Sequence, residues 1–205
     1  MITIKQYVQS EIVEKKSKFI ANIYYVETVE EAENKIKETK KKYHDARHNC
    51  SCYRVLKEGK IVEKQSDDGE PSGTAGGPML NILQKREIVN VVVIVTRYFG
   101  GILLGTGGLV RAYSDATQKA IDSAEKNKII LGVEYEVKVD YSNLEKLKYY
   151  ARTNNINIIN TEFQNEIVCT LQISNENESI FLEDVNKQNL TIIEYKKICE
   201  KYILK

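Results

Sequence analysis

Alternating and continuous hydrophobic stretches predict most of the strands in the first part of the chain. Residues 3–13 and 17–26 alternate or are rich in β-forming side chains, and the charged run between them predicts a hairpin. Two more strands are expected at 48–56 and 60–65, joined by a short turn. The five consecutive β-branched residues Val91–Val95 are typical of a strand that is buried on both faces of a sheet.

A helical period appears in three other segments of this first part. Residues 29–43 are charged, contain neither glycine nor proline, and are rich in helix-forming side chains. Residues 76–86 place a proline near the start and apolar side chains at helical spacing. Residues 109–126 carry one continuous apolar stripe. We therefore expect three helices beside the strands.

The rest of the chain has a different rhythm, which predicts a second domain. Its elements follow the order β-α-β-β-α-β, at 133–140, 143–152, 156–162, 166–173, 176–187 and 190–198. This order is that of a ferredoxin-like domain. Gly132 precedes the first of these strands and is the candidate boundary. The expected class is therefore α+β, with domains at 1–131 and 132–205.

Composition favours a globular protein in a reducing compartment. Of the 205 residues, 42% are hydrophobic and 29% are charged, which is ordinary for a soluble domain. No apolar run approaches the roughly 20 residues that span a bilayer, and the N-terminal residues do not resemble a signal peptide. The four cysteines show no disulfide framework. We expect a cytoplasmic protein with no membrane partner.

Charge is distributed unevenly between the two expected domains. The net charge of the whole chain is +1, which does not by itself indicate a polyanionic ligand. Residues 1–131 carry an excess of four positive charges, and residues 132–205 an excess of three negative ones. This asymmetry permits nucleic-acid binding by the first domain.

The most unusual stretch is RYFGGILLGTGGLVRAY, residues 97–113. Its dense glycines cost backbone entropy on folding, so a ligand or a tight crossover must require them. A Walker A loop is excluded because Thr106 stands where lysine is needed, and a dinucleotide fingerprint because Val110 fills its last position. The layout of a buried strand, a glycine loop and a helix N-terminus is nevertheless suited to an anion.

Two arginines flank this glycine loop and would complete an anion or nucleic-acid site. The candidate residues are Arg97, Tyr98, Gly100, Gly101, Gly105, Thr106, Gly107, Gly108 and Arg111. Tyr98 and Phe99 would stack on bases, although aromatic residues at strand ends more often pack internally. In the alternative interpretation the glycines only allow a tight crossover, and the arginines pair with nearby acids.

The segment DDGEPSGTAGGP, residues 67–78, brings three carboxylates close to a turn. Asp67, Asp68 and Glu70 leave a divalent metal site open, although they follow no recognised frame. Ser72 and Thr74 would either cap the following helix or bind a ligand, and capping is the commoner use of such residues.

The segment HDARHNCSC, residues 44–52, also contains groups that are capable of chemistry. A zinc site built from His44, His48, Cys50 and Cys52 is conceivable, but the spacing matches no standard pattern. Cys50 beside His48 could act as a thiolate nucleophile. Cysteines in strands are more often inert core residues.

The motifs HNCSCY, DDGEPSGTAGGPML and VTRYFGGILLGTGGLVRAY resemble the IMPACT family, specifically its bacterial YigZ-like branch. EKKSKFIA, residues 14–21, also fits this family. The resemblance implies a first domain like ribosomal protein S5 domain 2, a fold shared with elongation factor G domain IV and small-metabolite kinases. It implies a ferredoxin-like second domain similar to elongation factor G domains. Eukaryotic relatives control translation by blocking the activation of an initiation-factor kinase, and bacterial members are proposed to bind nucleic acid or ribosomes.

We therefore expect a binding and regulatory protein without catalytic residues, metal or cofactor, whose partners are RNA or the translation machinery. The residues expected beside its glycine loop are His48, Asp67, Asp68, Glu70, Ser72 and Thr74. The alternative is a phosphate-ester or nucleotide-using enzyme of the kinase or hydrolase type, for which Lys18, Arg111 and Asp68 are the candidates. A third possibility is a module that binds only a protein partner.

Overall fold

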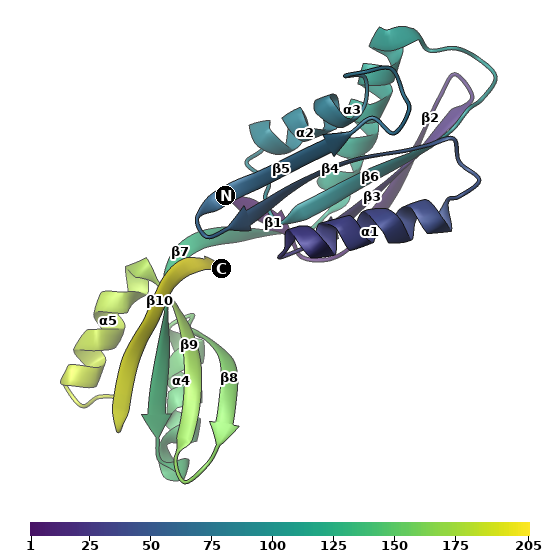
Figure 1. Ribbon diagram of the computed structural model, residues 1–205. Helices are drawn as coiled ribbons and strands as arrows, with labels where there is room; N and C mark the ends of the chain where they lie inside the picture. Colours follow the sequence, from purple (N-terminus) through teal and green to yellow (C-terminus); the bar gives the residue numbers. More distant parts are fainter. The chain divides into compact units, whose positions relative to one another are not determined.

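The computed structural model describes all 205 residues and consists of two compact units, Met1–Lys128 and Ile129–Lys205 (Figure 1). The division falls inside strand β7 (Lys126–Val139), whereas the sequence suggested a boundary at Gly132. None of the helices has the length and hydrophobicity that a membrane-spanning segment needs. All four cysteines are free thiols.

A five-stranded antiparallel sheet forms the centre of the first unit. Its strand order is β2-β3-β6-β4-β5, with bounds Val8–Glu14, Ser17–Tyr25, Val91–Tyr98, His48–Lys57 and Lys60–Ser66. The hairpins predicted from the sequence are confirmed as β2–β3 and β4–β5. The single strand expected at 3–13 is wrong, because a short β1 (Ile2–Ile4) separates from it and pairs with the start of β7.

Helices cover both faces of this sheet (Figure 1). Helix α1 (Val29–Lys42) packs on one face, and α2 (Gly76–Lys85) and α3 (Gly105–Ser123) pack on the other. Strand β6 contributes Val91, Val93 and Val95 to the core under α2 and α3, and Val92 and Ile94 to the core under α1. This confirms the prediction of a strand that is buried on both faces.

Helix α3 begins at Gly105, four residues before the start expected from its apolar stripe. Glycine has a poor helix propensity, so the sequence pattern placed Gly105, Gly107 and Gly108 in the loop. The buried face that starts at Leu109 holds the helix against the sheet and overrides this propensity. The exposed loop between β6 and α3 is therefore reduced to residues 99–104.

The second unit follows the predicted order of elements. Strand β7 is followed by α4 (Leu144–Thr153), β8 (Asn157–Phe163), β9 (Ile167–Ser174), α5 (Asn175–Asn186) and β10 (Glu194–Leu204), with a short η1 (Tyr141–Asn143) before α4. All strand pairs are antiparallel, in the order β10-β7-β9-β8. The last strand lies later than the expected 190–198. Leu190 is instead buried in the core of this unit, ahead of β10.

Gly132 lies within β7, paired with Ser174 of β9 on one side and Lys201 of β10 on the other. A Cβ atom at this position would collide with Ile203 Cδ1 and would lie 2.6 Å from the carbonyl oxygen of Ile173. Glycine is therefore required here by the close approach of neighbouring strands, and not by a turn or a linker.

We expect Gly132→Ala to lower the free energy of unfolding by about 1–3 kcal/mol, because the added methyl group overpacks the sheet. Urea denaturation followed by circular dichroism measures the loss. In Gly132→Ala/Ile203→Val the colliding Cδ1 is absent, so part of the stability should return. A Gly132→Ala protein as stable as the wild type would contradict the packing role.

Candidate functional site

The signature segments of the sequence meet at one end of the sheet in the first unit. The antiparallel register pairs Glu14 with Ser17, Lys18 with Tyr98, His48 with Arg97, and Ser51 with Ser66. The starts of β3 and β4 therefore lie beside the ends of β2, β6 and β5. We call this surface the loop end. It comprises residues 15–16, 43–47, 67–75 and 99–104, together with the first two turns of α3.

A buried ion pair lies beneath the loop end. A guanidinium N–H of Arg97 donates to Glu70 Oε1 at 2.7 Å, and the side chains are only 7% and 3% exposed. The hydroxyl of Tyr113 donates to the same oxygen at 2.8 Å, and His48 Nε2 lies 4.0 Å from Oε2. The contact between Arg97 and Glu70 therefore matches the alternative interpretation of the sequence, in which the arginines pair with nearby acids. The Nε of Arg97 has no hydrogen-bond partner, but it is buried, so a ligand at the surface would not reach it.

Asp67 caps helix α2 from outside the helix. Its carboxylate accepts hydrogen bonds from the backbone N–H groups of Gly73, Ala75 and Gly76, at 2.8, 3.0 and 2.8 Å. The prediction that Ser72 or Thr74 caps this helix is wrong. The hydroxyl of Thr74 donates to the carbonyl of Pro71 at 2.6 Å, and Ser72 is exposed. A carboxylate satisfies several N–H groups at once, which a single hydroxyl oxygen does less well.

Asp68 joins two other elements to the same turn. Its carboxylate accepts from the N–H of Asn49 at 2.7 Å and pairs with Lys40 of α1 at 2.5 Å. The backbone carbonyl of Asp68 contacts His48 Nδ1 at 2.9 Å. The three clustered carboxylates therefore bond to three different sets of internal groups. No cluster of three or more His, Cys, Asp or Glu side chains is placed to hold a metal ion.

The cysteines of β4 are buried thiols. Cys50 donates to the carbonyl of Asp67 at 2.9 Å, and burial raises the pKa of its thiol to about 12. Burial also raises the pKa of Cys52. Neither group is a thiolate near neutral pH, which supports the interpretation of both as core residues. His44 is exposed and makes no hydrogen bond.

The loop end also carries exposed cations, whereas its acidic residues Asp67, Asp68 and Glu70 are bonded within the protein. Lys15 and Lys16 form the β2–β3 turn, Arg47 precedes β4, and Arg111 lies on α3; all four are exposed and none pairs with a carboxylate. Lys15, Lys16 and Arg47 were not predicted as site residues from the sequence. The lysine run and the position just before a strand were the signals that could have identified them.

The glycine segment is exposed, and only some of its positions require glycine for steric reasons. A Cβ on Gly100 would collide with the backbone of Lys16, and the N–H of Gly100 donates to Ser17 Oγ at 3.2 Å. Gly107, in contrast, has open space around it. Helix α3 has neither a side-chain cap nor an acidic residue in its first turn. The N–H groups at its start, including that of the exposed Thr106, are therefore available to an outside acceptor.

The groups named for a kinase-like activity are largely engaged elsewhere. Lys18 pairs with Glu11 at 2.7 Å, and Asp68 pairs with Lys40. Only Arg111 of the three candidates lacks a partner. Tyr98 is also engaged, because its hydroxyl donates to Asp45 at 2.8 Å.

Comparison with known proteins identifies the family. Residues 15–121, just over half of the chain, match the model of the Impact N-terminal domain. The chain belongs to the IMPACT family. An IMPACT family member of Haemophilus influenzae is 34% identical over 176 residues, which cover 85% of each chain. The family member YvyE of Bacillus subtilis is 48% identical over 120 residues, covering 58% of this chain and 55% of that protein.

One solved structure resembles this chain over nearly its whole length. A crystal structure described as a hypothetical protein is 27% identical, covers 97% of both chains and superposes with a TM-score of 0.63. The two-domain translational regulator Yih1 is 26% identical over 58% of this chain, with a TM-score of 0.40. The family resemblance carried by the sequence motifs is confirmed.

We expect Arg97→Ala to destabilise the first unit by about 3–5 kcal/mol, because it leaves the Glu70 carboxylate buried without its cation. The matched variant Arg111→Ala removes an exposed guanidinium without a partner and should change stability by no more than about 0.5 kcal/mol. Urea denaturation of both variants makes the comparison. Equal stabilities would contradict the structural role of Arg97.

Thiol alkylation tests the assignment of the cysteines. At pH 7.5, iodoacetamide should modify the folded protein only at Cys199, which is exposed, and slowly, because burial and Glu134 raise the pKa of that thiol. Intact-mass spectrometry should show one added group on the native protein and four in urea. Modification of Cys50 in the folded protein would restore it as a candidate nucleophile.

Proposed function

We propose that this IMPACT family member binds RNA at the loop end and serves as an accessory of translation. The observation that carries the proposal is the division of charge at that surface. Asp67, Asp68 and Glu70 are bonded internally, whereas Lys15, Lys16, Arg47 and Arg111 face solvent without partners. A surface with unpaired cations attracts the phosphate backbone.

The start of α3 supports phosphate binding beside these cations. Its uncapped N–H groups carry the partial positive charge of the helix N-terminus, and Arg111 lies two turns into the same helix. Of the two arginines expected to flank an anion, this proposal retains Arg111 and assigns Arg97 to the support beneath the loop. The other ligands are the main chain of Gly105–Gly108 and the side chains of Lys15 and Lys16.

A base-stacking position is available at Phe99. The ring is 48% exposed, and the buried guanidinium of Arg97 lies 5.7 Å from its centroid. This cation–π contact restrains the ring at the surface, where a base can stack on its free face. Tyr98, which is held by Asp45, contributes less.

We also propose the domain assignments that the family resemblance implies. In the second unit, the order β-α-β-β-α-β and the antiparallel sheet β10-β7-β9-β8 support a ferredoxin-like domain related to those of elongation factor G. For the first unit, the resemblance supports the fold of ribosomal protein S5 domain 2. The link to translation rests on the family and not on a measured contact.

Salt-dependent RNA binding tests this function. The variant Lys15→Asn/Lys16→Asn/Arg111→Gln should bind a fluorescein-labelled 20-mer of oligouridylate at least about tenfold more weakly than the wild type. Its plot of log affinity against log salt should be shallower by about 2, because three phosphate contacts are lost. Asparagine is used in the turn because Lys15 and Lys16 have positive φ angles, which asparagine tolerates.

The control removes the same number of exposed cations away from the loop end, in Lys57→Asn/Lys60→Asn/Lys128→Gln; Lys57 and Lys60 lie at the β4–β5 turn and Lys128 lies in β7. This control should keep most of the affinity and the salt slope. If the loop-end variant and the control bind equally, or if the wild type does not bind RNA, the proposal is wrong.

A further inference from the structure

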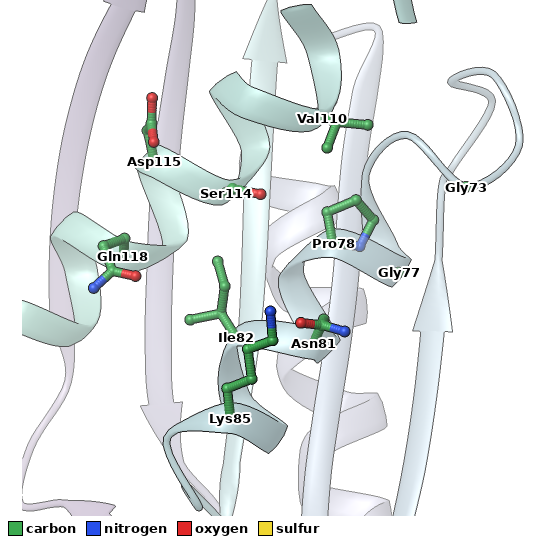
Figure 2. Close-up of a pocket in the computed structure, with 10 residues that line it drawn as sticks. All are labelled: Gly73, Gly77, Pro78, Asn81, Ile82, Lys85, Val110, Ser114, Asp115 and Gln118. Carbon is green, nitrogen blue, oxygen red and sulfur yellow. The ribbon is translucent and has the colours of Figure 1, made fainter. Parts of the chain in front are cut away.

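A groove of about 620 Å³ runs between α2 and α3 (Figure 2). Both helices begin at the loop end, and Figure 2 shows side chains of α2 and α3 on the two sides of the groove. Its apolar part consists of Pro78 and Ile82 from α2 and Val110 from α3. The groove is open along the helices and is not an enclosed cavity. Its shape therefore suits a segment of chain more than a small metabolite.

Four of the five polar side chains that line this groove have no hydrogen-bond or ion-pair partner within the protein, whereas the fifth, Gln118, donates to Asp122 at 3.3 Å. Asn81, Lys85, Ser114 and Asp115 line it, and none takes part in a side-chain hydrogen bond or an ion pair. Polar neighbours on the same helices are engaged. Arg86 pairs with Asp122 at 2.5 Å, and Gln84 donates to Glu63 at 2.8 Å.

These unengaged groups define the chemistry of a ligand. The amide of Asn81 can both donate to and accept from a peptide main chain, and the Ser114 hydroxyl can do the same. Lys85 attracts an acidic side chain, and Asp115 attracts a basic one. The groove contains one cation and one anion, so it has no net attraction for a polyanion, in contrast to the loop end.

We propose that this groove binds a peptide segment of a partner protein, in which an apolar side chain lies between an acidic and a basic one. The apolar side chain would pack against Ile82 and Val110. The site goes beyond the proposed RNA binding, because the groove shares none of its charged residues with the loop end. Each activity can therefore be removed without the other.

The probe is a phage-displayed library of random 12-residue peptides, selected on the immobilised full-length protein. Enriched sequences are synthesised with a fluorescein label and titrated in solution. We expect acidic and basic residues on either side of an apolar one, and affinities that Lys85→Glu and Asp115→Lys each lower by roughly tenfold. Lys57→Glu is a matched charge reversal outside the groove and should leave the affinity unchanged.

A charge exchange makes the test specific. The double variant Lys85→Glu/Asp115→Lys should bind a peptide whose acidic and basic residues are interchanged at least about tenfold better than it binds the original peptide. The loop-end variant Lys15→Asn/Lys16→Asn/Arg111→Gln should retain peptide binding, which separates this result from the outcome of the RNA experiment.

Three results would overturn the proposal. The first is that no sequence family is enriched, and the second is that peptides bind the single charge variants as tightly as the wild type. The third is that Lys85→Glu weakens and Asp115→Lys strengthens oligouridylate binding in the absence of peptide binding. In that case the groove would extend the RNA surface.

Discussion

The buried contact between Glu70 and Arg97 organises the signature region of this chain. Glu70 lies in the turn after β5, Arg97 lies in β6, and Tyr113 of α3 donates to the same carboxylate. Three separate segments of the chain are thus joined at one carboxylate oxygen, Glu70 Oε1. A buried ion pair of this kind is costly to desolvate, so its value lies more in determining one arrangement than in net stability. The contact fixes how the turn after β5, strand β6 and helix α3 meet beneath the loop end.

Much of the fold could be predicted because local patterns and tertiary structure agree in it. The β-branched run at Val91–Val95 and the apolar stripe from Leu109 needed no long-range information. The errors occurred where tertiary contacts override local preference. Gly105–Gly108 are helical despite their composition, and Gly132 sits in a strand because its neighbours approach closely. The shift of β10 has a different origin, because its side chains are mostly exposed and the strand therefore shows little hydrophobic periodicity.

The candidate site was only partly predictable from the sequence. The motifs pointed to the loop end, which lies within the residues that match the family model. The role of each charged group could not be deduced, because pairing depends on which segments the topology brings together. Arg97 and Arg111 look equivalent in the sequence, yet one is buried against Glu70 and the other is exposed. Lys15 and Lys16 lie near the glycine segment because the β2–β3 turn passes beside Gly100, which the sequence alone does not reveal.

Helices α2 and α3 start at the same end of the sheet, yet their dipoles differ in what they present to solvent. The carboxylate of Asp67 compensates the positive pole of α2, whereas that of α3 has no internal counter-charge. An approaching anion is therefore attracted by the N-terminus of α3 alone, and not equally by the N-termini of both helices. At physiological ionic strength that potential decays within about 8 Å, so it orients a ligand at the moment of contact and exerts little pull from afar.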